Sequence, residues 1–339
     1  KIRRALYKWG VFRRRYVEIP VISVGGITVG GSGKTPVVIH LAEVAHQLGI
    51  RVGVVSRGYG GDPGPKPFVL SQGDGISKGD VTKVGDEPLL ISKRVPTAIV
   101  VVHPKRYLAC CAAADLGAEL ILLDDGLQHQ QLKRNLDIVL LDARNPLGNG
   151  HYLPAGPLRD TPKTLSSADL VLLTRSDLAK GDDIANAKRV VTKWAPTAIV
   201  GNVMYACQEQ RKVSRDSESG HWVISEERAG LSGCSFHGMA GIARPEDFAE
   251  ALQKSGVSLT GFSKFSDHYK FKKKDLLAVN KAALHEGAQG IITTEKDVMR
   301  LPVDSEISLP VSAAMLSLQW SDEASQFIRK KLLSLTHKT

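Results

Sequence analysis

Apolar and polar positions alternate along the 339-residue chain in two regular patterns. Short, continuous runs of Val, Ile and Leu predict buried strands, whereas apolar residues three or four positions apart predict helices with one buried face. Strands are expected in the run from Val21 and at residues 51–56, 98–102, 119–125, 136–142, 169–173, 197–203, 234–239, 258–265 and 290–294. Helices are expected at residues 36–48, 105–116, 181–194, 245–254, 274–286 and 324–333, with a further helix beginning at 84–88.

This alternation indicates an α/β fold, with a parallel sheet covered by helices on both faces. A chain of 339 residues, 42% of them hydrophobic, is long enough for about two domains. The Pro- and Gly-rich loop 143–161 is expected to be either functional or a hinge, and the domain boundary is expected near it. We therefore expect a first domain at 1–155 and a second, smaller α/β domain at 156–339. The Gly-, Pro- and Asp-rich residues 62–80 predict an exposed excursion, and the polar stretch 206–228 predicts a surface hairpin.

The stretch 21–36, VISVGGITVGGSGKTP, places a glycine-rich turn between a strand and a helix. Crowded phosphate oxygens need backbone N–H groups brought close, so this layout predicts a P-loop in a P-loop NTPase-like sheet. Lys34 is expected between the β- and γ-phosphates, and the Thr35 hydroxyl is expected to ligate Mg2+. The expected nucleotide-binding residues are Thr28, Val29, Gly30, Gly31, Ser32, Gly33, Lys34 and Thr35, with Thr28 in place of the first glycine of the strict pattern.

Acidic residues stand at two further strand or helix ends. The apolar run ELILLDDGLQ ends in Asp124 and Asp125, which is a Walker B pattern that delivers a carboxylate to the metal that Thr35 touches. The sequence VGDEP places Asp86 and Glu87 at a helix start, where acids either cap the helix or take part in chemistry.

The charge of the chain is uneven. The net charge is +10, and the first fifteen residues contain many Lys and Arg and no acid. Ile2, Leu6, Trp9 and Phe12 or Arg13 fall at helical spacing, which predicts an amphipathic helix at an anionic membrane surface. The alternatives are a basic helix packed on the domain, or the end of an Arg-rich targeting sequence, since the chain starts at Lys1 and an upstream segment is expected.

Other compositional features exclude some classes of protein. No window approaches ~20 uninterrupted apolar residues, so nothing in the sequence predicts a membrane-spanning helix. The four cysteines have neither metal-type spacing nor the pattern of a disulfide framework, which favours a reducing compartment or buried thiols.

Seven motifs together resemble the tetraacyldisaccharide 4'-kinases. They are VGGITVGGSGKTP, SRGYGG, VGDEPLL, LDDGLQH, DARNPLGNGHYLPAGPLRD, FSDHYKF and TTEKD, in this order from about Tyr16 onward. The resemblance implies an ATP- and Mg2+-dependent kinase that phosphorylates the 4'-hydroxyl of the lipid A disaccharide-1-phosphate precursor. It also implies two α/β/α domains closing on a cleft, a place at the cytoplasmic face of the bacterial inner membrane, and a glycolipid substrate. We further expect a monomer and no nucleic-acid partner. The Arg-rich start leaves open the alternative of a mitochondrial protein from which a transit peptide has been removed.

The resemblance also implies roles for single residues. Asp86 matches the proposed general base, and His268 in Asp267-His268-Tyr269 matches the histidine that pairs with it, so the catalytic residues are Asp86, His268 and Lys34. The metal residues are Thr35, Asp124, Asp125 and Asp160, with Asp125 placed nearer the metal and Asp160 standing where the family usually has glutamate. For Glu295-Lys296-Asp297, a site role and a scaffold role are equally weighted.

Two other functions remain open from the sequence. The run Leu172-Leu173-Thr174-Arg175-Ser176-Asp177 resembles the loop by which P-loop GTPases read guanine, which favours a GTPase or metallochaperone-like switch. No Cys/His cluster is present to carry a metal, and the elaborate second half suits an acceptor site better. A membrane-surface scaffold with a vestigial P-loop would lack Lys34 or Asp125, and both are present.

Overall fold

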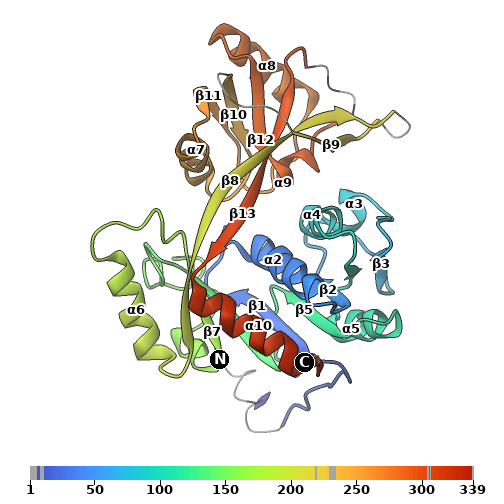
Figure 1. The fold of residues 1–339 in the computed structure, drawn as a ribbon, viewed down its shortest axis with the longest axis vertical. Coiled ribbons are helices and arrows are strands. Elements are labelled where there is room, and N and C mark those ends of the chain that lie inside the picture. Colours follow the sequence, from blue (N-terminus) through green and yellow to red (C-terminus); the bar gives the residue numbers. More distant parts are fainter. Residues whose placement is uncertain are drawn as a thin grey trace. The chain divides into compact units, whose positions relative to one another are not determined.

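A computed structural model gives the structure of the chain and describes residues 6–7, 11–217, 220–228, 234–303, 305 and 307–337. The chain forms two compact units, one of Lys1–Met204 with Leu318–Thr339 and the other of Tyr205–Ser317. Strands β8 (Ile199–Arg215) and β13 (Val311–Trp320) each run from one unit into the other (Figure 1). The division therefore differs from the expected boundary at 155/156, because two strands connect the units and the Pro- and Gly-rich loop stays inside the first one.

The first unit is built on a sheet that is parallel except at one edge. Every strand pair from β4 to β8 is parallel, and only β3 runs antiparallel to its neighbour. In spatial order the strands are β3 (Phe68–Gln72), β4 (Ile99–Val102), β2 (Val52–Ser56), β5 (Leu120–Asp124), β1 (Val21–Gly26), β6 (Leu136–Asp142), β7 (Leu170–Thr174) and β8.

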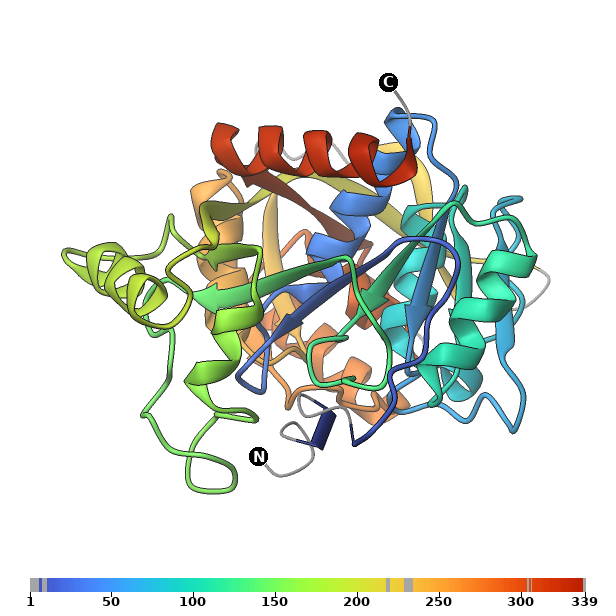
Figure 2. The ribbon, with the colours of Figure 1, turned by 90° about the horizontal axis from the view of Figure 1, so that it is seen from below.

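Helices cover both faces of this sheet, as predicted. Ile121 and Leu123 of β5 pack against α5 (Arg106–Asp115), while α2 (Lys34–Gln47) packs on β1, β2 and β5. Because the connections β1-α2-β2 and β4-α5-β5 run in opposite directions across the sheet, right-handed crossovers place α2 and α5 on opposite faces. Helix α10 (Asp322–Thr336) lies over α2 (Figure 2). The unit also contains α3 (Val81–Val84), α4 (Asp86–Arg94), α6 (Asp183–Trp194) and the 3-10 helix η1 (Pro162–Ser167).

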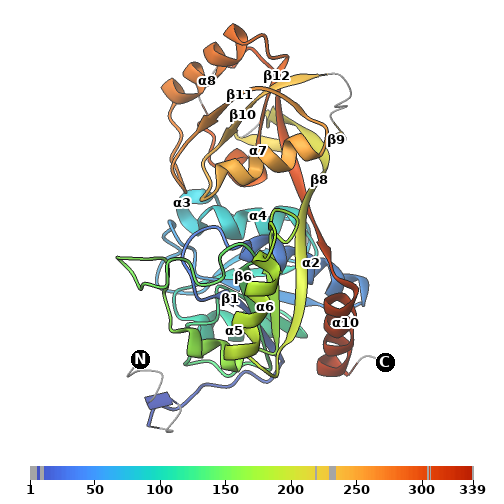
Figure 3. The same cartoon turned by 90° about the vertical axis from the view of Figure 1, so that its left-hand side faces the viewer.

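The second unit is a smaller α/β unit. Its strands follow the order β11 (Ser258–Lys264), β10 (Ser235–Ala240), β12 (Gly290–Thr294), β13 and β8, and β9 (Trp222–Arg228) forms an antiparallel hairpin with β8 as expected for 206–228. Ile292 packs against α7 (Pro245–Lys254), whereas its neighbour Ile291 packs against α8 (Lys273–His285). Since adjacent residues of a strand face opposite sides, α7 and α8 cover opposite faces (Figure 3). The short helix α9 (Glu295–Val298) follows β12 directly.

Three parts of the chain depart from the expectation. Residues 62–80 are not all an excursion, because the apolar segment β3 pairs with the edge strand β4, with Phe68 opposite Val102. Strand β13 was not predicted. The expected N-terminal helix lies partly outside the described residues, at 1–5 and 8–10; Leu6 and Tyr7 are helical, but residues 11–20 are not.

Arg15 explains the loss of the predicted helix after residue 10. Its N–H donates to the Gln131 carbonyl at 2.7 Å, and its own carbonyl accepts from Lys133 N–H at 3.0 Å. These long-range backbone hydrogen bonds hold the segment extended, which overrides its helical spacing. None of the helices in the described part of the chain is long and apolar enough to cross a membrane.

Candidate active site

The glycine-rich loop between β1 and α2 adopts a conformation that only glycine takes without strain. Gly30, Gly31 and Gly33 have φ values of 79°, 42° and 81°, in the left-handed region. Gly33 is the N-cap of α2, so the helix begins at Lys34 with its first N–H groups unpaired within the helix. A run of left-handed glycines before a helix start is the geometry of an anion nest.

The start of the loop is already paired with another segment. Val29 N–H donates to the Pro157 carbonyl at 2.8 Å, and Thr28 forms an antiparallel bridge with Leu158. The N–H of Val29 is therefore committed and does not line the nest, in contrast to the prediction for this residue. The N–H groups that remain for phosphate are those of Gly30–Lys34.

Lys34 extends from the helix start toward both the loop and the end of β5. Its ammonium donates to Ser32 Oγ at 3.2 Å and lies 3.8 Å from Asp125 Oδ1. Thr35, the next residue, is buried. The structure therefore brings together the lysine and one acid of the predicted Walker B pair, which come from sequence positions far apart.

Asp125 is held by an arginine that the sequence analysis did not assign. Arg159 donates from Nη1 to Asp125 Oδ2 at 2.6 Å and from Nη2 to Asp125 Oδ1 at 2.7 Å, and Nη2 also reaches the Gly26 carbonyl at 3.1 Å. Burial alone would raise the pKa of Asp125, but the Arg159 hydrogen bonds and the Lys34 charge outweigh it, and the pKa is lowered. Asp125 is thus an ionised carboxylate with both oxygens occupied.

Its neighbour Asp124 is in a different state. Asp124 is 2% exposed, and burial, followed by the nearby charges of Glu87 and Asp125, raises its pKa to about 7. Ser56 Oγ lies 3.4 Å from Asp124 Oδ2, but Asp124 Oδ1 is buried without a hydrogen-bond partner among the described residues. A bound cation would satisfy this oxygen and stabilise the carboxylate, so Asp124 fits a metal position.

The metal-binding capacity of the site depends on more than a cluster of protein side chains. Among the described residues no group of three or more His, Cys, Asp or Glu side chains is arranged to hold a metal ion. Mg2+ in nucleotide sites keeps waters and takes phosphate oxygens beside one or two carboxylates, so this arrangement is compatible with a magnesium–nucleotide complex.

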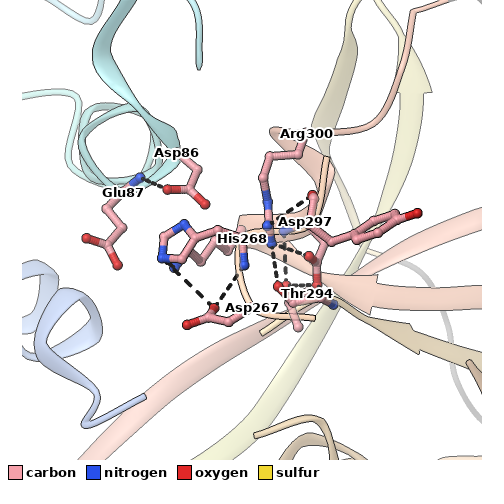
Figure 4. A network of polar contacts seen from close by, with 10 residues as sticks. Asp86, Glu87, Asp267, His268, Thr294, Asp297 and Arg300 are labelled. Carbon is pink, nitrogen blue, oxygen red and sulfur yellow. Dashed lines mark hydrogen bonds and ion pairs between the residues drawn. The ribbon is translucent and has the colours of Figure 1, made fainter. Parts of the chain in front are cut away.

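Asp86 is the first residue of α4 and is 3% exposed. Its Oδ1 accepts the N–H of Glu87 at 2.9 Å (Figure 4). The preceding Gly85 has φ 83°, and a Cβ there would lie 2.3 Å from the Tyr59 carbonyl. The glycine-rich SRGYGG loop and the VGDEP turn therefore pack closely together, and this packing fixes where α4 begins.

Asp160 follows Arg159 in the segment that pairs with the glycine-rich loop. Its N–H donates to the Ile27 carbonyl at 3.3 Å, and its Oδ1 accepts from Thr161 N–H at 2.8 Å. The side chain thus stabilises a turn at the edge of the site, and its metal role stays a prediction.

His268 lies in the second unit, in the loop between β11 and α8, with φ 55°. Its N–H donates to Asp267 Oδ1 at 3.1 Å, and Lys296 Nζ lies 3.3 Å from His268 Nε2. Because Asp86 belongs to the first unit and His268 to the second, the expected pairing of these two residues stays a prediction.

A buried ion pair supports the His268 loop. Asp297 is fully buried and accepts hydrogen bonds from Gly241 N–H at 3.1 Å, from the Thr294 hydroxyl at 2.7 Å and from Arg300 (Figure 4). Arg300 also donates to the Tyr269 carbonyl at 3.2 Å, next to His268. Burial raises the pKa of Asp297 while the Arg300 charge opposes the shift. Within TTEKD, then, Asp297 has a scaffold role and Lys296 contacts a candidate site residue.

Sequence reasoning missed the role of Arg159 and did not assign Glu87, whose charge acts on Asp124. The available signals were the Arg-Asp pair after the Pro- and Gly-rich loop and the second acid of VGDEP. Arg106 was also missed; its Nη2 donates to the Asp124 carbonyl at 3.3 Å, and its charge opposes the raised pKa of the same residue.

Comparison with known proteins gives consistent relatives. The family model described as tetraacyldisaccharide-1-P 4'-kinase matches residues 1–333. A protein of Syntrophotalea carbinolica named tetraacyldisaccharide 4'-kinase is 39% identical over 320 residues, covering 94% of this chain and 83% of that protein. A protein of the same name from Desulfotalea psychrophila is 33% identical over 342 residues, covering 98% and 93%.

A solved structure also resembles the chain over nearly its whole length. It is LpxK from Aquifex aeolicus, crystallised in complex with ATP, with a TM-score of 0.74 and 27% identity, covering 99% of this chain and 94% of that one. The match supports the P-loop NTPase-like α/β fold with its second α/β unit. With the family model spanning the site residues of both units, the chain belongs to the tetraacyldisaccharide-1-P 4'-kinase family.

Proposed function

We propose that this protein transfers the γ-phosphate of ATP to the 4'-hydroxyl of the lipid A disaccharide-1-phosphate precursor. The observation that carries the proposal is the position of Lys34, at the start of α2 behind three left-handed glycines and between Ser32 and Asp125. Phosphoryl transfer depends mainly on positioning and on neutralising charge, and a lysine here meets the β- and γ-phosphate oxygens. Family membership favours this kinase over a GTPase switch.

Thr35, Asp124, Asp125 and Asp160 remain the residues proposed for the Mg2+ region. Mg2+ held by these residues would neutralise negative charge on the nucleotide phosphates. The unpartnered Asp124 Oδ1 supports Asp124 as the direct or water-mediated ligand, whereas Asp125 holds Arg159 in place. Arg159 also lies near the Gly26 carbonyl, so its charge is available at the end of β1.

Asp86 is the proposed general base for the acceptor hydroxyl. Asp86 is the first residue of α4, next to the SRGYGG loop, and a carboxylate within hydrogen-bond reach orients the sugar hydroxyl and takes its proton. His268 is proposed to act with Asp86 when the second unit closes over the bound substrates.

The N-terminal segment is proposed to contact an anionic membrane surface. Val11 and Phe12 are 62% and 42% exposed, and Arg13 and Arg14, which follow them, are exposed as well. Apolar side chains beside cations suit a lipid interface. The named relatives are bacterial, which favours a place on the inner membrane over the mitochondrial alternative. The proposed oligomeric state is a monomer.

The test is ATP-dependent phosphorylation of the lipid A disaccharide-1-phosphate with the Lys34→Ala variant as comparison. We expect the wild type to transfer phosphate and the variant to lose transfer almost completely, because its ammonium is the cation placed at the helix start. Turnover of the variant within tenfold of wild type would rule out the P-loop role. If GTP binds at least a hundredfold tighter than ATP, and Asp177→Ala removes that preference, the switch hypothesis is correct instead.

A further inference from the structure

A buried arginine next to the glycine-rich loop has no role in the chemistry proposed above. Arg175 follows β7 directly, is 7% exposed and has φ 59°. Its Nη2 donates to the Gly31 carbonyl, and its Nη1 donates to Asp142 Oδ2 at 3.3 Å. Asp142 ends β6 and is itself 8% exposed. One guanidinium therefore joins the phosphate-binding loop to the ends of two strands of the sheet.

The Arg175 hydrogen bond holds the glycine-rich part of the loop, whose backbone has the least conformational preference of its own. Glycine populates positive and negative φ about equally, so three glycines in the left-handed region leave the loop with little conformational preference of its own. An anion nest works only when successive N–H groups converge on the ligand and the carbonyl groups turn away from it. Rotation of one peptide plane would present a carbonyl oxygen to phosphate, and like charges would repel.

Holding one carbonyl fixes the next N–H. In a planar trans peptide the C=O of one residue and the N–H of the next point in opposite directions. A guanidinium that holds the Gly31 carbonyl therefore holds the Ser32 N–H on the other side of the plane. Ser32 is in turn the residue whose hydroxyl accepts from Lys34 at 3.2 Å.

We propose that Arg175 is a positioning residue of the phosphate-binding loop, which orients the Gly31–Ser32 peptide so that Ser32 N–H faces the nucleotide phosphates. Asp142 is the counter-ion that keeps the buried guanidinium in place. This inference rests on the proposed nucleotide binding by the same loop. It gives the Thr174-Arg175-Ser176-Asp177 run a role in phosphate binding, where the sequence suggested base recognition.

The geometry requires an arginine. A guanidinium is planar and donates in two fixed directions at once, so it binds a carboxylate and a carbonyl together. A lysine ammonium keeps the charge opposite Asp142 but does not reproduce the fork. Arg175→Lys is therefore a conservative variant that should fold and still bind phosphate less well.

The matched control is the buried pair Arg134–Asp137. Arg134 Nε lies 2.6 Å from Asp137 Oδ1, and their side chains are 10% and 9% exposed, close to the 9% and 8% of Arg175 and Asp142. Asp137 lies at the start of β6 and Asp142 at its end. Replacing Arg134 by methionine takes a guanidinium from buried Asp137, and replacing Arg175 takes one from buried Asp142, which keeps its hydrogen bonds with Arg144. Both variants should therefore lose thermal stability, but only Arg175→Met disturbs the loop.

The experiment measures the Kd of ATP by calorimetry for the wild type, Arg175→Met, Arg175→Lys and Arg134→Met, with thermal unfolding of each. Inorganic tripolyphosphate serves as a second probe that reports on the nest alone. We expect Arg175→Met to raise the Kd of ATP and of tripolyphosphate by about 10- to 100-fold, which is the range for a lost hydrogen bond from a charged group. Arg175→Lys should fall between it and the wild type, and Arg134→Met should stay within about twofold of wild type.

The outcomes separate this inference from the proposed function. A wild-type protein that does not bind ATP contradicts the proposed function itself. Wild-type affinity in a folded Arg175→Met protein, or an equal loss in Arg134→Met, overturns the positioning role. If Arg175→Met does not fold, Arg175→Lys decides, since unchanged tripolyphosphate affinity in that variant also overturns the proposal.

Discussion

Arg159 donates two hydrogen bonds of 2.6 and 2.7 Å to the Asp125 carboxylate, so each Asp125 oxygen accepts a hydrogen bond from the guanidinium. The adjacent Asp124 has one buried oxygen without a hydrogen-bond partner and a raised pKa. Two consecutive acids at the end of one strand therefore differ in charge state and in hydrogen bonding. The charged Asp125 positions an arginine, and Asp124 is the acid that gains most from a cation.

This difference predicts how the two acids respond to substitution. Asp124→Asn should raise the Mg2+ concentration for half-maximal activity by more than about tenfold, because it removes the carboxylate that a cation would stabilise. Asp125→Asn should instead change the initial rate and its Mg2+ dependence as Arg159→Met does. The double variant should lose little more activity than either single variant, because the effects of paired residues are non-additive. Magnesium titrations of initial rates test this; a larger shift in Asp125→Asn than in Asp124→Asn would restore Asp125 as the nearer ligand.

The raised pKa of Asp124 predicts a pH dependence of stability. With a pKa of about 7 in the folded protein and an ordinary value of 3.8 when unfolded, the folded state holds one proton more between these limits. Its stability contribution is therefore full below the lower value and falls as pH rises, by about 1.4 kcal/mol per unit at most. Thermal unfolding of the ligand-free protein from pH 5 to 8 should decline more steeply in wild type than in Asp124→Asn, and parallel curves would contradict the assignment.

Much of the fold was predictable because the buried strands are continuous apolar runs. Strands β1, β5, β6 and β7 are buried along their whole length, and the pattern identifies them without tertiary information. The boundary between the units was not predictable in the same way, because β8 and β13 serve both. Only their pairing in the sheet shows that the chain leaves the first unit at Met204 and returns at Leu318.

The site was predictable where a local motif carries the chemistry, as in the glycine-rich loop. Arg159 and Arg175 were missed because each reaches the site from a distant position in the sequence. Arg159 lies 133 residues from Gly26 at the end of β1, and Arg175 lies 144 residues from Gly31 in the loop. The N–H of Val29 was misassigned for the same reason, since its acceptor is the carbonyl of Pro157. A sequence motif shows which residues are present but not which backbone groups are already paired.

The pair Asp297–Arg300 should contribute strongly to the stability of the second unit. The Asp297 side chain is fully buried and the Arg300 side chain is 5% exposed. Arg300→Met therefore leaves a buried carboxylate without its guanidinium partner, which typically costs about 3–5 kcal/mol of stability. The exposed pair Lys254–Glu250 is the control, and Lys254→Met should cost less than about 1 kcal/mol. Hydrogen exchange of backbone amides in the second unit during chemical denaturation measures this, and equal losses in the two variants would contradict the scaffold role.

Membrane engagement should depend on the charges near the start of the chain. Replacing Arg13 and Arg14 with Gln should weaken partition to anionic vesicles by about 1 kcal/mol per charge, and more at low salt. Arg15 is a poorer target, because its guanidinium lies 4.8 Å from the centre of the Tyr107 ring and its backbone is paired. Unchanged sedimentation with phosphatidylglycerol vesicles would show that the segment does not bind the membrane.

The general base is tested best by separating the two tasks open to Asp86. Its carboxylate accepts the Glu87 N–H at the start of α4, and Asn keeps that acceptor while losing the ability to take a proton. Asp86→Asn should therefore unfold like wild type and bind ATP normally, yet lose about 10²–10⁴-fold in kcat. A helix-start role alone predicts nearly full activity instead. If His268 acts with Asp86 as a unit, the double variant Asp86→Asn/His268→Ala should cost scarcely more than the worse single change. Losses that simply multiply would show that the two residues act separately, and His268 would then serve the loop that Lys296 and Arg300 contact.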